Sequence, residues 1–268
     1  MYMNRRALRL MKSGYEYQRS FSDCYKHTAY NAAGREWKAA KAVAVIVDYL
    51  QKFEKSPEEL LVLDIGCSTG YQSRYYGQFF RCVHGVDIDE KAVRHAANVN
   101  SSQNVVFHVQ DCMNLSFGQA TFDVVMCTHV YEHVPDAEKL ISEIYRVLKP
   151  EGICYFAAGN RLMYLEPHYK LPFLSILPKP LANFYCKLSG KSNRYYETHL
   201  SYWSLKRLVK KFQIVDYVCT ILQDPAKFSA TDIVQPNSIK QKISLLVSKH
   251  AYWLCPTYIW ILRKYCIC

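Results

Sequence analysis

The chain has 268 residues, of which 50% are hydrophobic by a broad count, and it contains only ten Gly and ten Pro. This composition suits one large globular domain and excludes a fibrous or intrinsically disordered chain. The formal net charge of +11 predicts attraction to nucleic acid, an anionic membrane face or a phosphorylated substrate, and does not choose among them.

The cysteine pattern indicates a reducing compartment. Eleven cysteines are present, and most lie inside apolar runs, where a free Cys behaves as a small hydrophobic residue. The odd count, the lack of a CxxC pair and the lack of His/Cys ligand spacing argue against disulfides and zinc, so we expect no metal. No secretory signal or apolar run of about 20 residues is found, so we expect a cytoplasmic protein that spans no membrane.

In chain order, weak helical character over the basic residues 1–30 is followed by a helix at 35–54, where Ala and Leu recur at helical spacing. Short apolar runs then alternate with helical patterns. We expect these strands at 60–65, 82–87, 104–110, 122–130 and 152–159, and helices at 70–80, 89–100 and 135–150. Such alternation predicts βαβ units in a parallel sheet.

The rhythm breaks after Gly159, where residues 160–200 combine four prolines with many aromatics. We expect an inserted cap there, and then a helix at 202–211, a strand at 212–222, a loop at 224–240, a helix near 238–249 and a strand near 257–263. The predicted fold is α/β: a doubly wound, mostly parallel seven-stranded sheet with helices on both faces and a cap after strand five. The predicted organisation is an N-terminal helical segment (1–57), a cofactor-binding half (58–160), the cap (161–201) and a part that completes the same domain (202–268).

The stretch LDIGCSTGY carries the first sign of a ligand site. A buried strand ends at Asp64 and passes into a turn with Gly66 and Gly70, and Asp87 ends the next strand 21 positions after Gly66. An acid at that offset can accept hydrogen bonds from two ribose hydroxyls. The third glycine of a GxGxxG pyrophosphate loop is missing, because position 71 is Tyr, and no Gly-Lys-Ser/Thr of a P-loop follows.

Five stretches, LDIGCSTGY, GVDID, VVFHVQD, FDVVMCTHVYEHVPD and RVLKPEG, together resemble the successive motifs of class I S-adenosylmethionine-dependent methyltransferases. The resemblance covers about residues 58–160 and is closest to the small-molecule group that includes quinone-pathway enzymes. It implies a Rossmann-like fold, S-adenosyl-L-methionine as cofactor and methyl transfer as activity. One departure is Ser68, which stands where the family usually has the middle glycine of its first motif. Ser68 fits if its backbone dihedrals are ordinary.

The resemblance assigns cofactor roles residue by residue. Backbone groups of the turn would face the methionine part, and Asp64 would orient the turn and reach the amino group. Asp87 would hold the ribose, Ile88 would pack on adenine, Asp111 would accept from its amine, and the Cys112 backbone would read a ring nitrogen. The residues expected at the cofactor are Asp64, Gly66, Cys67, Ser68, Gly70, Asp87, Ile88, Asp111, Cys112 and His129.

His129 and His133 are the candidate catalytic bases, needed only if the acceptor holds a proton at neutral pH. Their spacing of four would put them on one face of a helix, with Glu132 pointing elsewhere. The alternative is that His133 and Glu132 belong to a structural turn that starts the next helix and that neither histidine is catalytic. Asp123 is expected to be a loop or capping residue, and Asp89 an N-cap.

The segment after strand five should select the acceptor. Its expected contacts are Asn160, His168, Tyr169, Tyr195, Tyr196 and His199. The mixture of apolar and basic residues in LPFLSILPKPLANFYCKLSGK suits a lipid-linked acceptor at an anionic membrane surface, although a cap that packs on the sheet would have the same composition.

Three functions remain open at this point. The first is a methyltransferase that acts on a small or lipid-linked acceptor, in the cytoplasm or peripherally on a membrane. The second is an RNA methyltransferase, which the charge favours, although the fourth strand lacks the Asn/Asp-Pro-Pro-Tyr/Phe and Pro-Cys patterns of nucleic-acid enzymes. The third is a cofactor-binding protein without catalysis.

Overall fold

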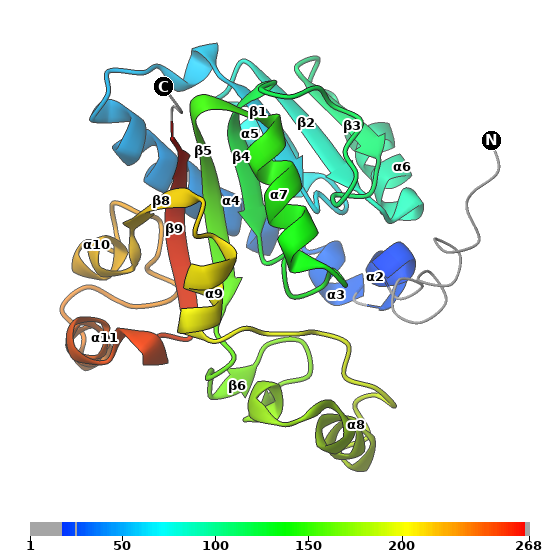
Figure 1. The fold of residues 1–268 in the computed structure, drawn as a ribbon, viewed down its shortest axis with the longest axis vertical. Coiled ribbons are helices and arrows are strands. Elements are labelled where there is room, and N and C mark those ends of the chain that lie inside the picture. The colour runs from blue at the N-terminus through cyan, green and yellow to red at the C-terminus, as the bar shows by residue number, and fades with distance from the viewer. Residues whose placement is uncertain (1–17, 25, 266–268) are drawn as a thin grey trace.

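The computed structural model describes residues 18–24 and 26–265. The basic segment at the start of the chain lies outside these residues. The described N-terminal part contains the short helices η1 (Gln18–Ser20), α2 (Phe21–Cys24) and α3 (Lys26–Ala29), which lie near the lower ends of the central strands in Figure 1.

A seven-stranded sheet forms the centre of the described chain, in the order β3-β2-β1-β4-β5-β9-β8. Its strands are β1 (Leu61–Ile65), β2 (Cys82–Asp87), β3 (Val105–Val109), β4 (Phe122–Thr128), β5 (Leu148–Gly159), β8 (Phe212–Asp216) and β9 (Thr257–Lys264). All pairs are parallel except those that β9 makes with β5 and β8. The predicted doubly wound, mostly parallel sheet is confirmed. The strand order reverses between β1 and β4, which is where such sheets bind ligands.

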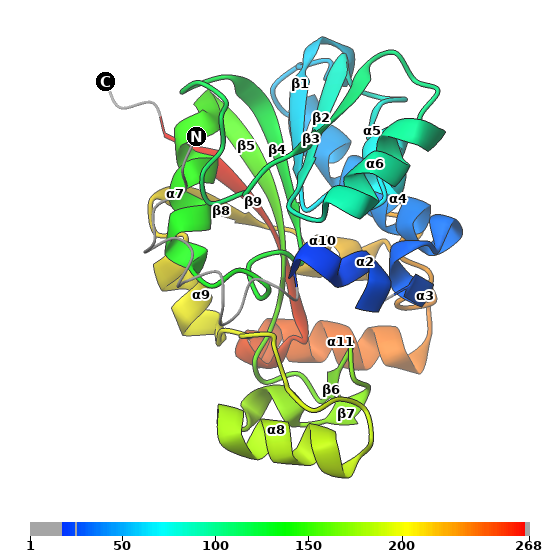
Figure 2. The same ribbon diagram turned by 90° about the vertical axis from the view of Figure 1, so that its right-hand side faces the viewer.

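Helices cover both faces of the sheet (Figures 1 and 2). One face packs against α7 (Ala137–Val147) and α9 (Tyr202–Leu208), and the other against α4 (Ala32–Gln51), α5 (Tyr71–Tyr76) and α10 (Val218–Gln223). The helix α6 (Glu90–Val99) contacts β2 and β3. The central strands are therefore buried on both sides, which explains why they appear in the sequence as unbroken apolar runs.

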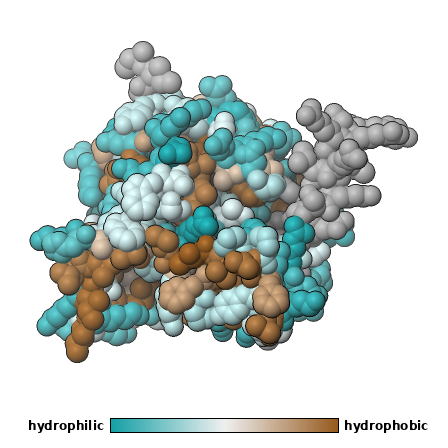
Figure 3. Space-filling view, turned by 60° about the horizontal axis from the view of Figure 1, so that its bottom comes forward, coloured by the Kyte–Doolittle hydropathy of each residue, from teal (hydrophilic) through white to brown (hydrophobic). Residues whose placement is uncertain are grey.

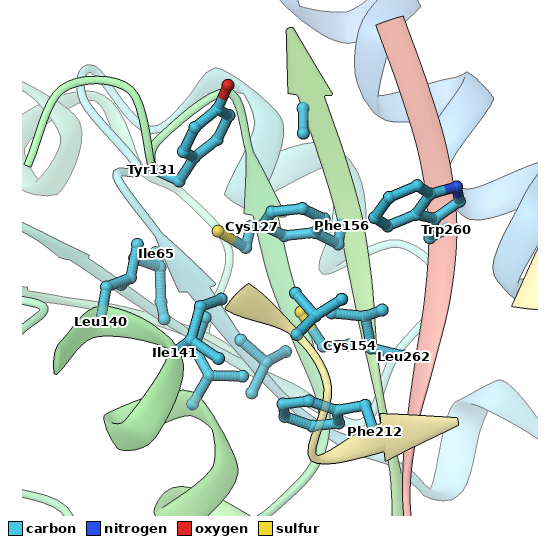
Figure 4. Packing of buried hydrophobic residues seen from close by; sticks show 14 of the residues in the cluster. Ile65, Cys127, Tyr131, Leu140, Ile141, Cys154, Phe156, Phe212, Trp260 and Leu262 are labelled. Atoms are coloured by element: carbon cyan, nitrogen blue, oxygen red, sulfur yellow. The ribbon is translucent and has the colours of Figure 1, made fainter. Parts of the chain in front are cut away.

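The core between α7 and the sheet illustrates the packing (Figure 4). Leu140, Ile141 and Ile144 recur at helical spacing on α7 and are buried against strand residues such as Ile65 and Phe156. Burial of each such side chain stabilises the fold by about 1.5–3 kcal/mol. The first turn of α7 is held by Asp136, whose side chain accepts a hydrogen bond from Lys139 N.

Two acidic residues have structural roles: Asp89 is a helix cap, as expected, whereas Asp123 lies within β4 and not in a loop or cap. Asp89 is the N-cap of α6 and accepts a hydrogen bond from Ala92 N. Asp123 lies near the start of β4, at the end of the sheet opposite the ligand crevice. Its carboxylate accepts a hydrogen bond from Leu61 N and forms an ion pair with Lys149. Both carboxylates tie neighbouring elements together.

The strand predicted over residues 212–222 is wrong in its second half. The strand β8 ends at Asp216, and α10 follows, because Val218 and Ile221 are buried at helical spacing. The Asp216 side chain accepts a hydrogen bond from Val218 N and so stabilises the start of the helix. An apolar run without clear period does not distinguish a strand from a buried helix.

The segment between β5 and α9 forms the expected cap. It contains β6 (Leu165–Glu166), β7 (Leu171–Pro172), η3 (Leu174–Ile176) and α8 (Lys179–Leu188). The cap has a small hydrophobic cluster of its own, made by Tyr169, Leu171, Leu174, Ala182, Cys186 and Tyr195. Figures 1 and 2 show it beyond the end of the sheet at which β5 finishes.

The remaining elements are η2 (Pro57–Glu59), α11 (Ile239–His250) and η4 (Tyr252–Leu254), which runs into β9. α11 and the cap lie at the same end of the molecule (Figures 1 and 2). None of the helices in the described ranges combines the length and the apolar character needed to cross a membrane.

Candidate functional site

A cleft opens at the carboxyl ends of β1 and β4, where the strand order reverses. We call it the first cleft. Of the residues predicted to bind a cofactor, seven line it: Gly66, Ser68, Asp87, Ile88, Asp111, Cys112 and His129. The remaining three, Asp64, Cys67 and Gly70, are not among its lining residues. The topology therefore brings together side chains from four successive strand ends.

The glycines of the first turn have different local roles. Gly66 has φ of 73°, and a Cβ there would lie 2.8 Å from a methyl carbon of Val130, so only glycine fits. Gly70 has φ of 76° and begins α5, where a Cβ would collide with Phe107 and Ala96. Gly66 shapes the floor of the cleft, and Gly70 allows α5 to pack on α6 and β3.

Ser68 does not have the ordinary backbone dihedrals under which it was expected to replace the family's glycine. Its φ is 49°, which is the left-handed region and not an ordinary serine conformation. Its backbone N–H donates to Asp87 Oδ2 at 2.8 Å, and its buried hydroxyl has no hydrogen-bond partner in the described structure. A strained residue with an unsatisfied buried hydroxyl in a cleft is typical of a ligand site.

The Asp87 carboxylate is fixed before any ligand binds. Oδ2 accepts the hydrogen bond from Ser68 N, and Oδ1 accepts one from Asp89 N at 2.9 Å. Burial raises the pKa of Asp87, and the two backbone hydrogen bonds oppose that shift. Each carboxylate oxygen can accept more than one hydrogen bond, so both can also bind the hydroxyls of a vicinal diol.

Asp64 lies beneath the turn and not in the first cleft. Its Oδ2 accepts a hydrogen bond from Ser73 Oγ at 2.5 Å, which ties the end of β1 to α5. Burial raises the pKa of Asp64 to about 7, against the Ser73 hydrogen bond and the positive charge of Arg35. The neighbouring Cys67 is also buried.

Two cations of α4 line the cleft and were missed from the sequence: Arg35 and Lys38. Burial lowers the pKa of Arg35, while the charges of Asp87 and Asp64 act to raise it. Arg35 and Lys38 thus supply positive charge to a cleft that is also lined by the acids Asp87 and Asp111. The only sequence signal was a basic residue on the polar face of a predicted helix, about 30 positions from the glycine turn.

His129 directly follows β4, has a left-handed φ of 54° and is held by a hydrogen bond from its N–H to the carbonyl oxygen of Ala157. Its Nδ1 lies 3.2 Å from Oε1 of Glu132, so the imidazole donates to that carboxylate. The expectation that Glu132 points elsewhere is therefore wrong. Burial would raise the pKa of Glu132, but the His129 hydrogen bond and nearby imidazoles lower it to about 2.

His133 belongs to a turn and not to a helix, so the one-face argument for the two histidines does not apply. It nevertheless lines the first cleft with His129. Its Nδ1 lies 3.8 Å from Oε1 of Glu197, and its ring meets that of His168 edge-on at 4.9 Å between centroids. Burial lowers the pKa of His133 to about 4, so the imidazole is neutral at neutral pH.

The cap contributes four polar side chains beside His133. His168 lines the first cleft, and its Nδ1 lies 2.8 Å from Oε1 of Glu166. His199 Nε2 lies 3.5 Å from the same oxygen. The sequence predicted His168 and His199 as acceptor contacts but missed Glu166 and Glu197. We call Glu132, His133, Glu166, His168, Glu197 and His199 the His–Glu cluster.

A second cleft adjoins the first on the far side of His133. Tyr195 and Tyr196, both predicted acceptor contacts, line it together with Arg194 and Lys179. His133 and Val134 line both clefts. Lys179 Nζ donates to the carbonyl oxygens of Tyr195, Tyr196 and Glu197 and so fixes this wall.

Three predicted acceptor contacts line neither cleft: His199, which lies in the His–Glu cluster, Asn160 and Tyr169. Asn160 is fully buried, and its Nδ2 donates to Trp253 O, Cys255 O and Tyr258 Oη. Its Oδ1 accepts from Leu162 N, so its side chain joins β5 to the chain before β9.

Tyr169 lies in the cap core. Its hydroxyl donates to the carbonyl oxygen of Arg194, and its ring packs against that of Tyr195.

Comparison with known proteins also identifies a methyltransferase domain in the central part of the chain. The family model described as a methyltransferase domain matches residues 63–156. The chain is 33% identical to a ubiquinone biosynthesis O-methyltransferase of Coxiella burnetii over 102 residues, which are 37% of this chain and 44% of that protein. It is 35% identical to a 2-methyl-6-phytyl-1,4-hydroquinone methyltransferase of Synechocystis over 107 residues, 39% of this chain and 34% of that protein. The chain thus spans less than half the length of these relatives.

A solved structure resembles most of the fold. An S-adenosylmethionine-dependent methyltransferase from Mesorhizobium loti matches with a TM-score of 0.52 and 16% identity, over 81% of this chain and 96% of that one. At this identity the likeness concerns the fold alone.

Proposed function

We propose that this chain, which carries a class I S-adenosylmethionine-dependent methyltransferase domain at residues 63–156, transfers a methyl group from S-adenosylmethionine to a hydroxyl of a small or lipid-linked acceptor. The observation that carries the proposal is the Asp87 carboxylate, which lies in the first cleft at the end of β2, beside the turn that holds Gly66 and Ser68. The quinone-modifying relatives support an apolar, ring-containing acceptor.

The residues of the first cleft fit this cofactor. Asp87 can accept from both ribose hydroxyls, and Ser68 has an unsatisfied buried hydroxyl beside the turn. The partly buried Ile88 offers an apolar surface for adenine, and Asp111 offers an acceptor for its amine. Arg35 supplies the positive charge that a methionine carboxylate requires.

When bound, S-adenosylmethionine supplies a methyl group that its sulfonium has already activated. The protein therefore has to align the acceptor with that group and exclude water. His129 lies at the end of β4 in the first cleft, and its Nδ1–H is committed to Glu132. Its Nε2 is then the basic nitrogen and can take the hydroxyl proton of an acceptor.

We assign the acceptor to the second cleft, because it adjoins the first cleft at His133 and Val134. Tyr195 and Tyr196 offer aromatic surface for a ring. Arg194, which is exposed, offers a positive charge for an acidic substituent.

The same end of the molecule has the composition of a membrane-facing surface. Figure 3 shows hydrophobic residues gathered there between polar ones. The exposed apolar residues of α8 and α11 are Leu181, Phe184, Leu188, Ile239, Ile243 and Leu246. Exposed lysines lie among them, and an apolar face with a basic rim suits an anionic lipid surface. We propose that this end rests on such a surface and takes a lipid-linked acceptor from it.

Labelled methyl transfer from S-adenosylmethionine into a cell lysate, divided into lipid, small-molecule, RNA and protein pools, tests the activity. We expect label in the lipid or small-molecule pool, and much less label with Asp87→Asn at a concentration of S-adenosylmethionine that does not saturate the variant. Label in RNA alone would support the competing RNA methyltransferase, which the net charge of +11 favours.

Flotation with vesicles tests the membrane surface. We expect binding to vesicles that contain anionic lipid, and its loss with the double substitution Phe184→Ser and Leu188→Ser on α8. The matched control is Val109→Ser, which removes an exposed apolar side chain from β3 at the far edge of the sheet. Equal flotation of the double variant and the control would refute the surface.

A further inference from the structure

The His–Glu cluster is an unusual concentration of buried acid. The side chains of Glu132, Glu166 and Glu197 belong to three separate segments of the chain, and their residues are 2%, 0% and 0% exposed. Around them lie the imidazoles of His133, His168 and His199. Buried carboxylates are costly unless positive charge compensates them.

The backbone holds the three segments of the cluster together. Thr198 N donates to the carbonyl oxygen of Glu132 at 2.8 Å, which joins the loop before α9 to the turn after β4. Lys170 N donates to the carbonyl oxygen of Glu166, which closes the turn between β6 and β7. The cluster is therefore built into the fold of the cap.

The Glu166 carboxylate holds His168 in place. Oε2 accepts from the backbone N–H groups of His168 and Tyr169 at 2.8 and 2.7 Å, and Oε1 lies 2.8 Å from His168 Nδ1. Donation of Nδ1–H to Glu166 leaves the lone pair of His168 on Nε2. Metal-binding histidines usually have such a carboxylate partner, which fixes their tautomer and orientation.

The donor atoms of His133, His168 and Glu197 converge. One ligand atom from each lies within 4.8 Å of the other two, and Nδ1 of His133 is 3.8 Å from Oε1 of Glu197. Ligand distances of about 2.0–2.2 Å around a tetrahedral ion separate neighbouring ligand atoms by roughly 3.3–3.6 Å. Small movements of these side chains would close the site.

Two lysines act on the cluster from the surrounding elements. Lys179 Nζ is held by three carbonyl oxygens, among them that of Glu197. Lys38 acts on Glu132 from α4 but is an exposed residue. One oxygen of Glu132, Oε2, is buried and has no hydrogen-bond partner in the described residues. A divalent cation would balance the acids of the cluster from within it.

We propose that His133, His168 and Glu197 bind a divalent transition-metal ion, with Zn²⁺ as the best match, and that Glu166 orients His168 from the outer shell. Two imidazoles and one carboxylate are ligands that Zn²⁺ prefers, and three protein ligands leave a position open for a substrate atom. Because His133 lines both clefts, that position lies at their junction. This proposal differs from the expectation of no metal, which rested on cysteine and ligand spacing, because the members of this set are neither cysteines nor regularly spaced along the chain.

The role of the ion rests on the proposed function. An acceptor hydroxyl bound at the open position has a lowered pKa and gives its proton to His129. Its oxygen then forms the new O–C bond to the methyl group, and the electron pair of the breaking C–S bond returns to sulfur. The products are the methyl ether and S-adenosylhomocysteine.

Calorimetric titration of the chelator-treated full chain with ZnCl₂ tests the site. We expect one tight equivalent of Zn²⁺, a Co²⁺ adduct with visible absorption, and much weaker binding of Mg²⁺. Glu197→Gln and His168→Ala should each lower the Zn²⁺ affinity at least 100-fold, and Glu166→Gln about 10- to 100-fold. The matched control is His108→Ala, which removes one ring of the stacked His84–His108 pair on β2 and β3 and should leave the tight equivalent unchanged.

Circular dichroism confirms folding of each variant, and Glu197→Gln, which keeps volume, remains informative if His168→Ala does not fold. Absence of a tight equivalent in the parent, or its persistence in the Glu197 and His168 variants, would overturn the proposal. Titration with S-adenosylmethionine separates the two hypotheses. Zinc binding without cofactor binding refutes the proposed function alone, and cofactor binding without zinc binding refutes the metal site alone.

Discussion

Asp87→Asn is the sharpest test of the cofactor site, because it exchanges one carboxylate oxygen for an amide nitrogen at nearly constant volume. Both oxygens now accept backbone hydrogen bonds, from Ser68 N and Asp89 N. An amide nitrogen cannot accept either bond and would face an N–H donor. A hydrogen bond to a charged group contributes about 1.5–3 kcal/mol, so we expect the free energy of unfolding to fall by about that amount.

The same exchange removes a charged acceptor for the ribose. The expected loss is again about 1.5–3 kcal/mol, which corresponds to a dissociation constant raised roughly 10- to 150-fold. Calorimetric titration with S-adenosylmethionine and S-adenosylhomocysteine measures this change, and urea denaturation measures stability separately. The matched control is Asp123→Asn, which removes a carboxylate that also accepts a backbone hydrogen bond but lies at the other end of the sheet.

The control separates loss of a ligand contact from general loosening of the fold. Asp123→Asn should lower stability and leave cofactor affinity unchanged. Equal cofactor affinity in Asp87→Asn and the parent would refute the assignment of the ribose to this carboxylate. Equal loss of affinity in both variants would mean that binding follows stability and not the contact.

Three further predictions concern the first cleft and the glycine turn beside it. Arg35→Gln should weaken S-adenosylmethionine binding about 10-fold or more but leave methylthioadenosine, which lacks the carboxylate, unaffected in titration calorimetry; equal weakening of both ligands would contradict the contact. Asp64 has a pKa near 7 in the folded protein, above its unfolded value, so its stabilisation is complete at low pH and is lost as the pH rises through 7. Relative to Asp64→Asn, the parent should therefore lose about 2–3 kcal/mol of stability between pH 5 and pH 8 in urea denaturation, and parallel pH profiles would refute the shift. Gly70→Ala should lower the free energy of unfolding by at least about 1–3 kcal/mol, because Gly70 has a positive φ and the added Cβ would collide with Phe107. An unchanged urea midpoint would refute that reasoning.

The sheet could be predicted because its signals are local. Each central strand contains a short apolar run that is buried on both faces, and a polar residue lies close to its ligand end. The spacing of Gly66 and Asp87 required only that β1 and β2 be adjacent and parallel, which their register confirms. The strand prediction was wrong for the second half of the run 212–222, because a buried helix face and a buried strand have the same apolar composition.

The His–Glu cluster could not be predicted, because no spacing along the chain connects its parts. Glu132 lies after β4, Glu166 in the cap hairpin and Glu197 before α9. Their proximity depends on how the cap folds against the carboxyl ends of the strands, through bonds such as Thr198 N to the carbonyl oxygen of Glu132. Arg35 was missed for the same reason, since α4 reaches the cleft only through its packing on α5.

Backbone strain helps to locate the site only in combination with other observations. Nine residues other than glycine have positive φ in the described ranges, and most of them lie in loops away from the clefts. Of the nine, only Ser68 and His129 line the first cleft. They follow β1 and β4, the two strands between which the order reverses, and hydrogen bonds to Asp87 and Ala157 hold them in place. The sheet thus holds a residue with an unfavourable positive φ on each side of the crevice. A binding site needs groups there that are fixed before the ligand arrives.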